Sequence, residues 1–275
     1  MAWTIVGLVT VVVGTTPLQA AASGASGASQ KPTVLITGAN RGIGLELVRE
    51  YSARDWHVIA TARDPADASE LKALAARDPD IDIEALDVTD DAQFHQLAAK
   101  LKDQPIDVLL SNAARTPRYI SAMKGIQTMD FAEARHSFNV NALGPARLIG
   151  TFMPNVAMSG QKKIAVMSSK AASFAEGPKL SMMHEYRMSK VALNMMVHAA
   201  SFELARKGIT IVAISPGSVD TPAVEGELGF GTNLKQPNAI PIAESVAGIL
   251  RVIDNMTKEQ NGLFLDYKDG RVIPR

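Results

Sequence analysis

Short apolar runs alternate with amphipathic stretches from residue 33 to the end of the chain. Most of the apolar runs are rich in Val, Ile and Leu and lack polar alternation, which is typical of strands covered on both faces. The pattern predicts buried strands over Thr33–Thr37, His57–Ala62, Ile81–Leu86, Asp107–Ser111, Lys163–Ser168, Thr210–Ser215 and Gly262–Leu265.

Between these strands the apolar residues recur at helical spacing. Alternation of strands and helices favours a parallel sheet with right-handed crossovers. No internal repeat or second linker interrupts the pattern, so we expect one doubly wound α/β domain over residues 31–275, with a seven-stranded parallel sheet flanked by helices. The predicted helices are Ile43–Arg54, Ala66–Arg77, Asp91–Lys102, Phe131–Val156, His184–Lys207 and Ala243–Asn255.

Composition and charge exclude several kinds of site. Lys plus Arg and Asp plus Glu both number 28, and no basic stripe is present, so nothing favours nucleic acid as a partner. The chain has no cysteine, which excludes disulfides, thiolate metal sites and cysteine nucleophiles. Its five histidines are scattered, so we expect no metal site.

A glycine-rich turn, Thr37–Gly44, joins the first strand to the first helix. This order brings backbone N–H groups and a helix N-terminus against a phosphate. Glycine is needed where a Cβ would block the pyrophosphate or keep the helix away from the strand. The turn predicts a dinucleotide site in a Rossmann-type domain, with contacts from Gly38, Asn40, Arg41, Gly42, Ile43 and Gly44.

The end of the second strand indicates which dinucleotide binds. An NAD site of this kind is expected to have an acid about 20 residues past the turn, which accepts hydrogen bonds from the ribose 2′-hydroxyl. Here Ala62 holds that position, Arg63 follows it, and Arg41 lies in the turn. Two guanidinium groups attract a 2′-phosphate, so NADP(H) is favoured over NAD(H). Asp64 is an alternative partner for the ribose or for Arg63.

Tyr186 and Lys190 are four residues apart at the start of a predicted helix, so they lie on one face of it. A cation near a phenol stabilises the phenolate and lowers the tyrosine pKa toward neutral pH, where a general acid/base works best. Tyr-x-x-x-Lys alone is common by chance. Its weight comes from its order with a serine pair at a strand end, Ser168-Ser169, and with Asn141 farther upstream.

In this order the motifs resemble those of the classical short-chain dehydrogenase/reductase family, over the chain from Thr33 to its end. The spacing of the turn, G-x-x-x-G-x-G, is the first mark of that family. The stretches Thr-Ala-Arg-Asp-Pro and Phe-Asn-Val-Asn-Ala-Leu-Gly-Pro and the tail Gly262–Pro274 look most like the small carbonyl-reductase-like members of the C-factor and Sniffer type.

The resemblance implies further cofactor contacts at the strand ends. Asp87, followed by Val88, matches the acid that binds the adenine amino group. Asn112 and Ala113 match the family's Asn-Asn-Ala-Gly, with Arg115 as a departure where glycine is usual. A Pro-Gly turn that closes on the nicotinamide supplies Pro216, Gly217, Val219 and Thr221.

The same resemblance implies the catalytic roles. Ser169 would bond the substrate carbonyl, and Ser168 stays a rival because the segment before Tyr186 is longer than the family's usual spacing. Tyr186 would be the proton donor. Lys190 would hold the ribose hydroxyls, and Asn141 would support a water that passes protons to that lysine.

We therefore expect an NADP(H)-dependent oxidoreductase acting on a small-molecule carbonyl or secondary alcohol. The alternative is a catalytically weak NADP(H)-binding sensor or signalling protein, because some C-factor relatives are known for signalling. Pro222–Pro241 is predicted to be a substrate lid. Arg115 and Lys179 either hold an acidic group or face water. Family members often pair through the two long helices, so a homodimer or homotetramer is expected, with Ala192, Met195, Met196, Ala199 and Ala200 as a candidate face.

Residues 1–30 differ from the domain in composition. Trp3–Val13 is mostly apolar, Ala20–Ala22 supplies small residues, and Ser23–Gln30 is typical of a flexible linker. An export signal, a weak membrane tether and a disordered extension all stay open. An export signal implies a periplasmic or secreted protein, whereas the need for a soluble nicotinamide cofactor favours the cytoplasm.

Overall fold

The computed structural model describes residues 1–3, 31–116, 122–221 and 238–274. Lys31–Arg275 forms one compact unit, separate from Met1–Gln30. The predicted export signal and nearly all of the predicted lid lie outside the described residues. Among the helices that are described, none is long and apolar enough to cross a membrane.

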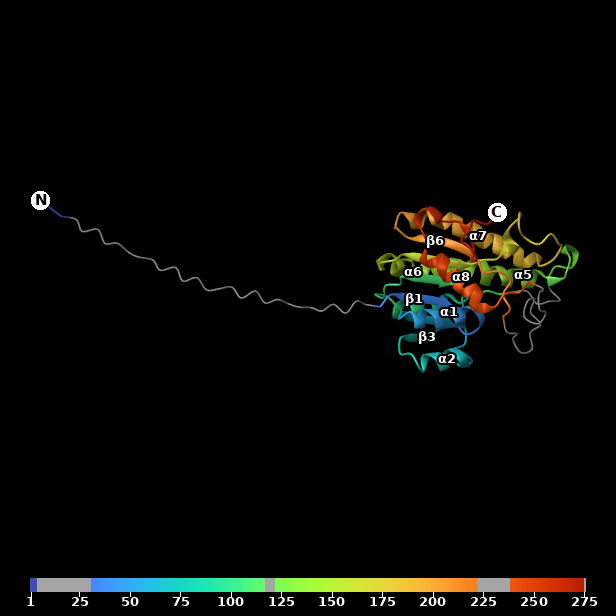
Figure 1. Cartoon of the computed structure of the whole chain (residues 1–275), viewed down its shortest axis with the longest axis horizontal. Helices are drawn as coiled ribbons and strands as arrows, with labels where there is room; N and C mark the ends of the chain where they lie inside the picture. The colour runs from blue at the N-terminus through green and yellow to red at the C-terminus, as the bar shows by residue number, and fades with distance from the viewer. Residues whose placement is uncertain (4–30, 117–121, 222–237, 275) are drawn as a thin grey trace. The chain divides into compact units, whose positions relative to one another are not determined.

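The domain is built on one parallel sheet in the order β3-β2-β1-β4-β5-β6-β7. Figure 1 labels three of these strands, β3, β1 and β6. Every pairing along this order is parallel, which confirms the predicted doubly wound α/β fold. The strands are β1 Thr33–Thr37, β2 His57–Ala62, β3 Ile81–Ala85, β4 Val108–Ser111, β5 Lys163–Met167, β6 Thr210–Ser215 and β7 Phe264–Asp266.

Helices cover both faces of the sheet, which is why the strands are apolar at consecutive positions. Val34 and Ile36 pack with α1, α2 and α8 on one face. Leu35, which points the other way, packs with α3, α6 and α7. The helices are α1 Gly42–Ala53, α2 Ser69–Ala75, α3 Asp91–Lys100, α5 Phe131–Phe138, α6 Gly144–Met158, α7 His184–Ala205 and α8 Ile242–Asp254.

The helix predicted over Phe131–Val156 is interrupted. Between α5 and α6 the backbone forms a π-helical stretch, Asn139–Leu143. Pro145 explains the interruption, because proline has no N–H to donate and its ring crowds the carbonyl four residues earlier. Single π turns inside α-helices are frequent at functional sites.

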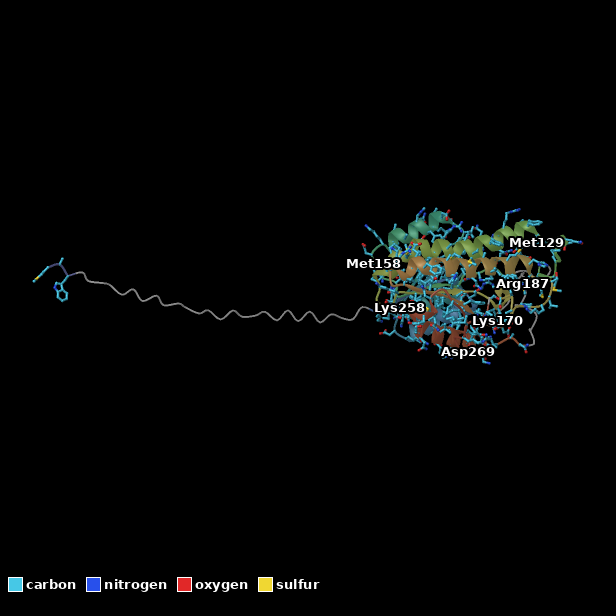
Figure 2. The ribbon with its side chains drawn as sticks, turned by 90° about the horizontal axis from the view of Figure 1, so that it is seen from above. Met129, Met158, Lys170, Arg187, Lys258 and Asp269 are labelled. Carbon is cyan, nitrogen blue, oxygen red and sulfur yellow. The ribbon has the colours of Figure 1, made fainter. Side chains whose placement is uncertain are left out.

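Figure 2 separates the two ends of the domain. Lys170, just past the carboxyl end of β5, lies toward the same end as Arg187 and Met129, and Met158 and Lys258 lie at the other. The carboxyl ends of parallel strands are where a doubly wound sheet binds its ligands. The candidate site is therefore sought at the Lys170 end.

Candidate active site

Two glycines of the turn, Gly38 and Gly44, pack too closely against their neighbours to be replaced by residues with side chains. Gly38 has φ +66°, and a Cβ on it would lie 2.9 Å from Ala113 Cα. A Cβ on Gly44 would overlap the carbonyl oxygen of Gly38 and come within 2.6 Å of Asn112 Nδ2. The two glycines are needed to bring the start of α1 against the turn.

Asn112 holds this turn through its side-chain amide. Its Nδ2 donates to the carbonyls of Thr37 at 3.0 Å and Gly38 at 3.1 Å. The Thr37 hydroxyl accepts from the backbone N–H groups of Asn112 and Ala113 at 3.0 and 3.1 Å. Asn112 thus fixes the shape of the predicted cofactor loop, a role that sequence spacing alone did not reveal.

The first turn of α1 is suited to an anion. Its N-cap residue, Arg41, has extended backbone and makes no side-chain capping bond, and no acid lies in the first turn. The N–H groups at a helix N-terminus then carry unbalanced positive charge. Thr221, in the segment after β6, lies close to this turn, since a Cβ on Gly42 would lie 3.5 Å from Thr221 Cγ2. The turn therefore fits a dinucleotide pyrophosphate.

The residues predicted around the adenosine have different surroundings. Arg41 and Arg63 are both exposed. Asp64 Oδ1 accepts from the Ala66 N–H at 2.9 Å, so this oxygen caps a local turn. Asp87 Oδ1 accepts from the N–H and hydroxyl of Thr89 at 2.8 and 2.7 Å. Val88 is buried and packs against α6, where a Cβ on Gly144 would lie 3.0 Å from its Cγ2.

Ser169, Tyr186 and Lys190 come together where β5 ends and α7 begins. The Ser169 hydroxyl lies close enough to the Tyr186 phenol to favour the ionised form of the phenol. Lys190 Nζ lies 5.8 Å from the centroid of the Tyr186 ring and donates to the Met167 carbonyl at 2.8 Å. The rival serine faces elsewhere, because Ser168 Oγ donates to Asn194 Oδ1 at 2.6 Å. Of the two serines, the geometry favours Ser169 as the partner of the phenol.

Burial dominates the electrostatics of this group. It lowers the pKa of Lys190 to about 7, because the ammonium is removed from water. It also raises the pKa of Tyr186, against a smaller lowering by the nearby Ser169 hydroxyl. The sequence predicted a lowered tyrosine pKa, so burial shifts the pKa in the opposite direction to the expected one.

Asn141 is buried in the π-helical stretch and its amide is fully engaged with neighbouring segments. Its Oδ1 accepts from the Arg115 N–H at 2.7 Å, and its Nδ2 donates to the Arg115 carbonyl at 2.9 Å and to Ser189 Oγ at 3.0 Å. Ser189 immediately precedes Lys190. The amide therefore ties the end of β4 to the helix that carries Tyr186 and Lys190.

The turn after β6 is fixed by the C-terminal part of the chain. The Pro216 carbonyl accepts from Ser245 Oγ at 2.6 Å. Gly217 has φ +86°, and a Cβ there would lie 2.8 Å from Tyr267 Cε1. Val219 pairs with Ile240 in a short parallel bridge. The four residues predicted to contact the nicotinamide thus lie on a backbone segment held from several sides.

Two arginines near the site have roles that the sequence did not predict. Arg115 donates in a fork to Glu133 at 2.5 and 2.8 Å, so its charge is balanced within the protein. Arg187, next to Tyr186, donates to the carbonyls of Ala171 and Leu180 at 3.3 and 3.0 Å. It braces the loop between the serine and the tyrosine. The residue types alone do not predict which partners these two arginines bind.

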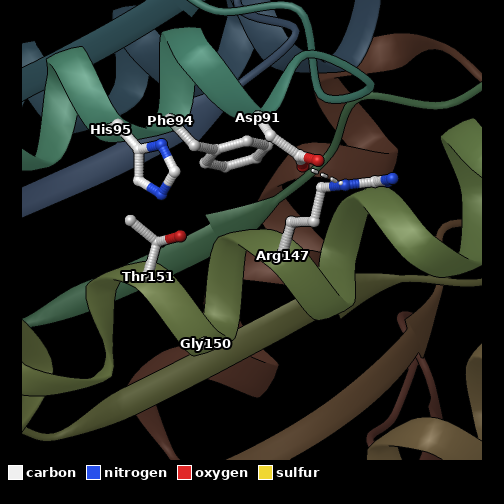
Figure 3. A pocket seen from close by; sticks show the side chains of 6 residues that line it. All are labelled: Asp91, Phe94, His95, Arg147, Gly150 and Thr151. Atoms are coloured by element: carbon white, nitrogen blue, oxygen red, sulfur yellow. Dashed lines mark hydrogen bonds and ion pairs between the residues drawn. The ribbon is translucent and has the colours of Figure 1, made fainter.

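A surface hollow of about 550 Å³ lies elsewhere, between α3 and α6 (Figure 3). Arg147 Nε donates there to Asp91 Oδ1 at 2.7 Å, which balances the main charge in it. None of its lining residues was predicted as a site residue, so it is distinct from the group around Tyr186. The lining consists of Asp91, Phe94, His95, Arg147, Gly150 and Thr151.

Comparison with known proteins gives consistent matches. Residues 32–228 match the short chain dehydrogenase family. An uncharacterized oxidoreductase of Schizosaccharomyces pombe is 33% identical over 259 residues, 90% of this chain and 99% of that protein. C-signal of Myxococcus xanthus is 33% identical over 171 residues, 62% of this chain and 93% of that protein. The NADPH-bound carbonyl reductase from chicken fatty liver superposes with a TM-score of 0.78 at 31% identity, over 90% of this chain and 100% of that one.

These matches make the protein an oxidoreductase of a class that uses a nucleotide cofactor. It belongs to the short-chain dehydrogenase family, and it is carbonyl-reductase-like within that family. The resemblance inferred from the motifs is confirmed. In the part of the chain that is described, no group of three or more metal-ligating side chains comes together.

Proposed function

We propose that the protein is an NADP(H)-dependent oxidoreductase that interconverts a carbonyl and a secondary alcohol, with Tyr186 as general acid/base. The observation that carries this proposal is the grouping of three side chains: the Ser169 hydroxyl lies close to the Tyr186 phenol, and Lys190 Nζ lies 5.8 Å from the centroid of the phenol ring. Two hydroxyls grouped in this way can both reach one substrate oxygen.

When bound, NADPH supplies a hydride. The turn Gly38–Gly44 and the segment Pro216–Thr221 would hold it, together with Asp87, Val88, Asn112 and Ala113. Tyr186 Oη donates its proton to the substrate oxygen in the direction of reduction. Ser169 donates a hydrogen bond to the same oxygen, and such a bond lowers the barrier because it strengthens as charge develops. Lys190 carries a positive charge below its pKa of about 7, and this charge near the phenol favours proton release from Tyr186.

Preference for NADP(H) is supported by the exposed guanidinium groups of Arg41 and Arg63 and by the absence of an acid at Ala62. Asp64 Oδ1 is engaged with the Ala66 N–H. The NADPH in the chicken carbonyl reductase agrees with this preference.

We also propose a homo-oligomer. Met188, Met195 and Phe202 are exposed at seven-residue intervals on α7 and form one apolar face. Met196 and Ala200, which were predicted on the same face, pack partly into the core. Light scattering of the native chain and of Met195→Glu tests this, with a smaller particle expected for the variant.

The function is tested by a panel of carbonyls and alcohols, followed at the nicotinamide absorbance with NADPH and NADH in parallel. Tyr186→Phe is expected to lose turnover while its Kd for NADPH stays at the wild-type value, because only the phenol oxygen is removed. Wild-type turnover in that variant would refute the assignment of Tyr186. NADPH binding without any turnover in the native protein would favour the sensor alternative.

A further inference from the structure

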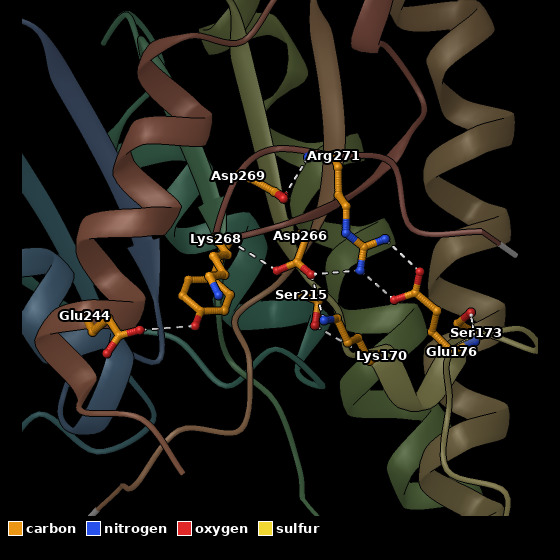
Figure 4. Close-up of polar contacts among 10 residues, drawn as sticks. Lys170, Ser173, Glu176, Ser215, Glu244, Asp266, Lys268, Asp269 and Arg271 are labelled. Carbon is orange, nitrogen blue, oxygen red and sulfur yellow. Dashed lines mark hydrogen bonds and ion pairs between the residues drawn. The ribbon is translucent and has the colours of Figure 1, made fainter. Parts of the chain in front are cut away.

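The closing segment of the chain forms a polar cluster with the loop that follows the predicted catalytic serine (Figure 4). Asp266, the last residue of β7, is at the centre of the cluster, and its side chain is only 4% exposed. Its Oδ2 lies 2.6 Å from Lys170 Nζ and 3.4 Å from Arg271 Nη2. Its Oδ1 accepts from the Lys268 N–H at 3.2 Å.

Through this cluster the C-terminal tail holds the serine loop at successive points. Lys170 immediately follows Ser169. Three residues on, Ser173 Oγ donates to the Pro274 carbonyl at 2.5 Å. Arg271 then donates in a fork to Glu176 at 2.6 and 2.7 Å, as Figure 4 shows. The whole start of the loop is therefore fastened to the tail.

The burial of the two ion pairs shows which of them matters more. Both side chains of the Arg271–Glu176 pair are partly exposed, and pairs of that kind contribute little. Asp266 is nearly fully buried, so loss of Lys170 would leave its carboxylate with only the more distant Arg271, which is unfavourable. The Lys170–Asp266 pair is therefore the one that sets the position of the loop.

Position matters here because the adjacent serine must meet a single substrate oxygen. Ser169 Oγ already accepts from the Ala171 N–H at 3.2 Å, and it lies close to the Tyr186 phenol. A displacement of about 1 Å at such a group lowers turnover by about 100-fold. The same tail also packs Tyr267 against Gly217, on the cofactor side of the site.

We infer that Asp266 is a positioning residue, which acts through Lys170 to orient the Ser169 hydroxyl during carbonyl reduction. The inference rests on the proposed function, since it gives Ser169 its role. It also explains why the tail Gly262–Pro274, which begins Gly-x-Phe-x-Asp-Tyr, contacts the loop that follows Ser169.

The test is a double-mutant comparison of Asp266→Asn in the wild-type and Ser169→Ala backgrounds. In the wild type the substitution should leave the Kd for NADPH unchanged and lower kcat by about 10-fold. This loss is smaller than the loss expected when a catalytic group moves by about 1 Å. In the Ser169→Ala background kcat should change by less than about 2-fold, because the affected group is already gone. Lys170→Met should reproduce the pattern. Glu70→Gln, which breaks the remote Arg49–Glu70 pair, is the matched control.

An equal loss of kcat in both backgrounds would overturn the inference, because it would mean that Asp266 acts on general stability. A second readout needs no substrate. Amide hydrogen exchange at Ala172, Ser173 and Gly177, whose N–H groups bond within the loop, should accelerate in Asp266→Asn, while exchange in β1 stays the same. Unchanged exchange in the loop would refute the inference even if the native protein proved inactive.

Discussion

Lys190 and Tyr186 lie one turn apart on α7, with the ammonium nitrogen 5.8 Å from the centroid of the phenol ring. The lysine is buried and donates a hydrogen bond to the carbonyl oxygen of Met167. Removal from water lowers its pKa to about 7. Its charge therefore titrates near neutral pH, where the proposed proton transfer takes place.

Lys190→Met should change how stability depends on pH. An unfolded lysine has a pKa of about 10.4, so between pH 7 and that value the unfolded chain holds a proton that the folded chain has released. Wild-type stability should then rise with pH by about 1.4 kcal/mol per unit, relative to the variant. Denaturant unfolding at pH 7, 8 and 9 measures this difference. Parallel profiles for the two proteins would show that the lysine stays charged when folded.

The strands and the fold class were predictable because covered strands need continuous apolar residues. The bounds of β1, β2 and β6 agree with the prediction, and β3, β4 and β5 differ by a single residue at one end. The interruption at Asn139–Leu143 was missed, although Pro145 was visible. Helical spacing of the apolar residues on either side, in α5 and α6, predicted one continuous helix.

The candidate site was predictable as a set of strand ends but not as a set of contacts. Parallel strands bring the turn, Ser169 and Asn112 to one edge of the sheet, whatever the details of packing. The pairing of Arg115 with Glu133, or of Asp266 with Lys170, depends on side chains that meet only after the chain folds. The pKa of Tyr186 depends on burial, which a spacing of four residues does not reveal.

The two neighbouring serines should respond differently to alanine. Ser169→Ala removes the hydroxyl that lies next to the Tyr186 phenol, so kcat should fall by about 100- to 1000-fold, as for loss of a donor to a developing oxyanion. Ser168→Ala removes a bond to Asn194 and should mainly lower stability, by about 1 kcal/mol. Steady-state kinetics and thermal unfolding of both variants separate these effects. A larger loss of kcat in Ser168→Ala would reverse the assignment.

Arg41→Ala and Arg63→Ala should each weaken NADPH binding by about 10- to 100-fold, the range for a hydrogen bond to a charged group. NADH binding should stay nearly constant, because NADH has no 2′-phosphate. Fluorescence titration with both cofactors gives the two constants. Arg54→Ala, which breaks an exposed pair with Asp254 at the far end of α1, is the control. Equal weakening toward both cofactors would argue against a 2′-phosphate contact.

Two glycines in helices should respond in opposite ways to substitution by alanine, and one of them, Gly44, tests the cofactor turn. Gly44→Ala places a methyl group onto the Gly38 carbonyl and Asn112 Nδ2, both held by hydrogen bonds, so the turn must open. Nucleotide binding should then be lost and stability lowered. Gly150→Ala on α6 meets nothing within 4 Å, and it should stabilise the protein by about 0.5–1 kcal/mol through helix propensity. Thermal unfolding with and without NADPH measures both outcomes. If Gly44→Ala kept the wild-type shift on NADPH addition, the nucleotide would have to bind somewhere other than this turn.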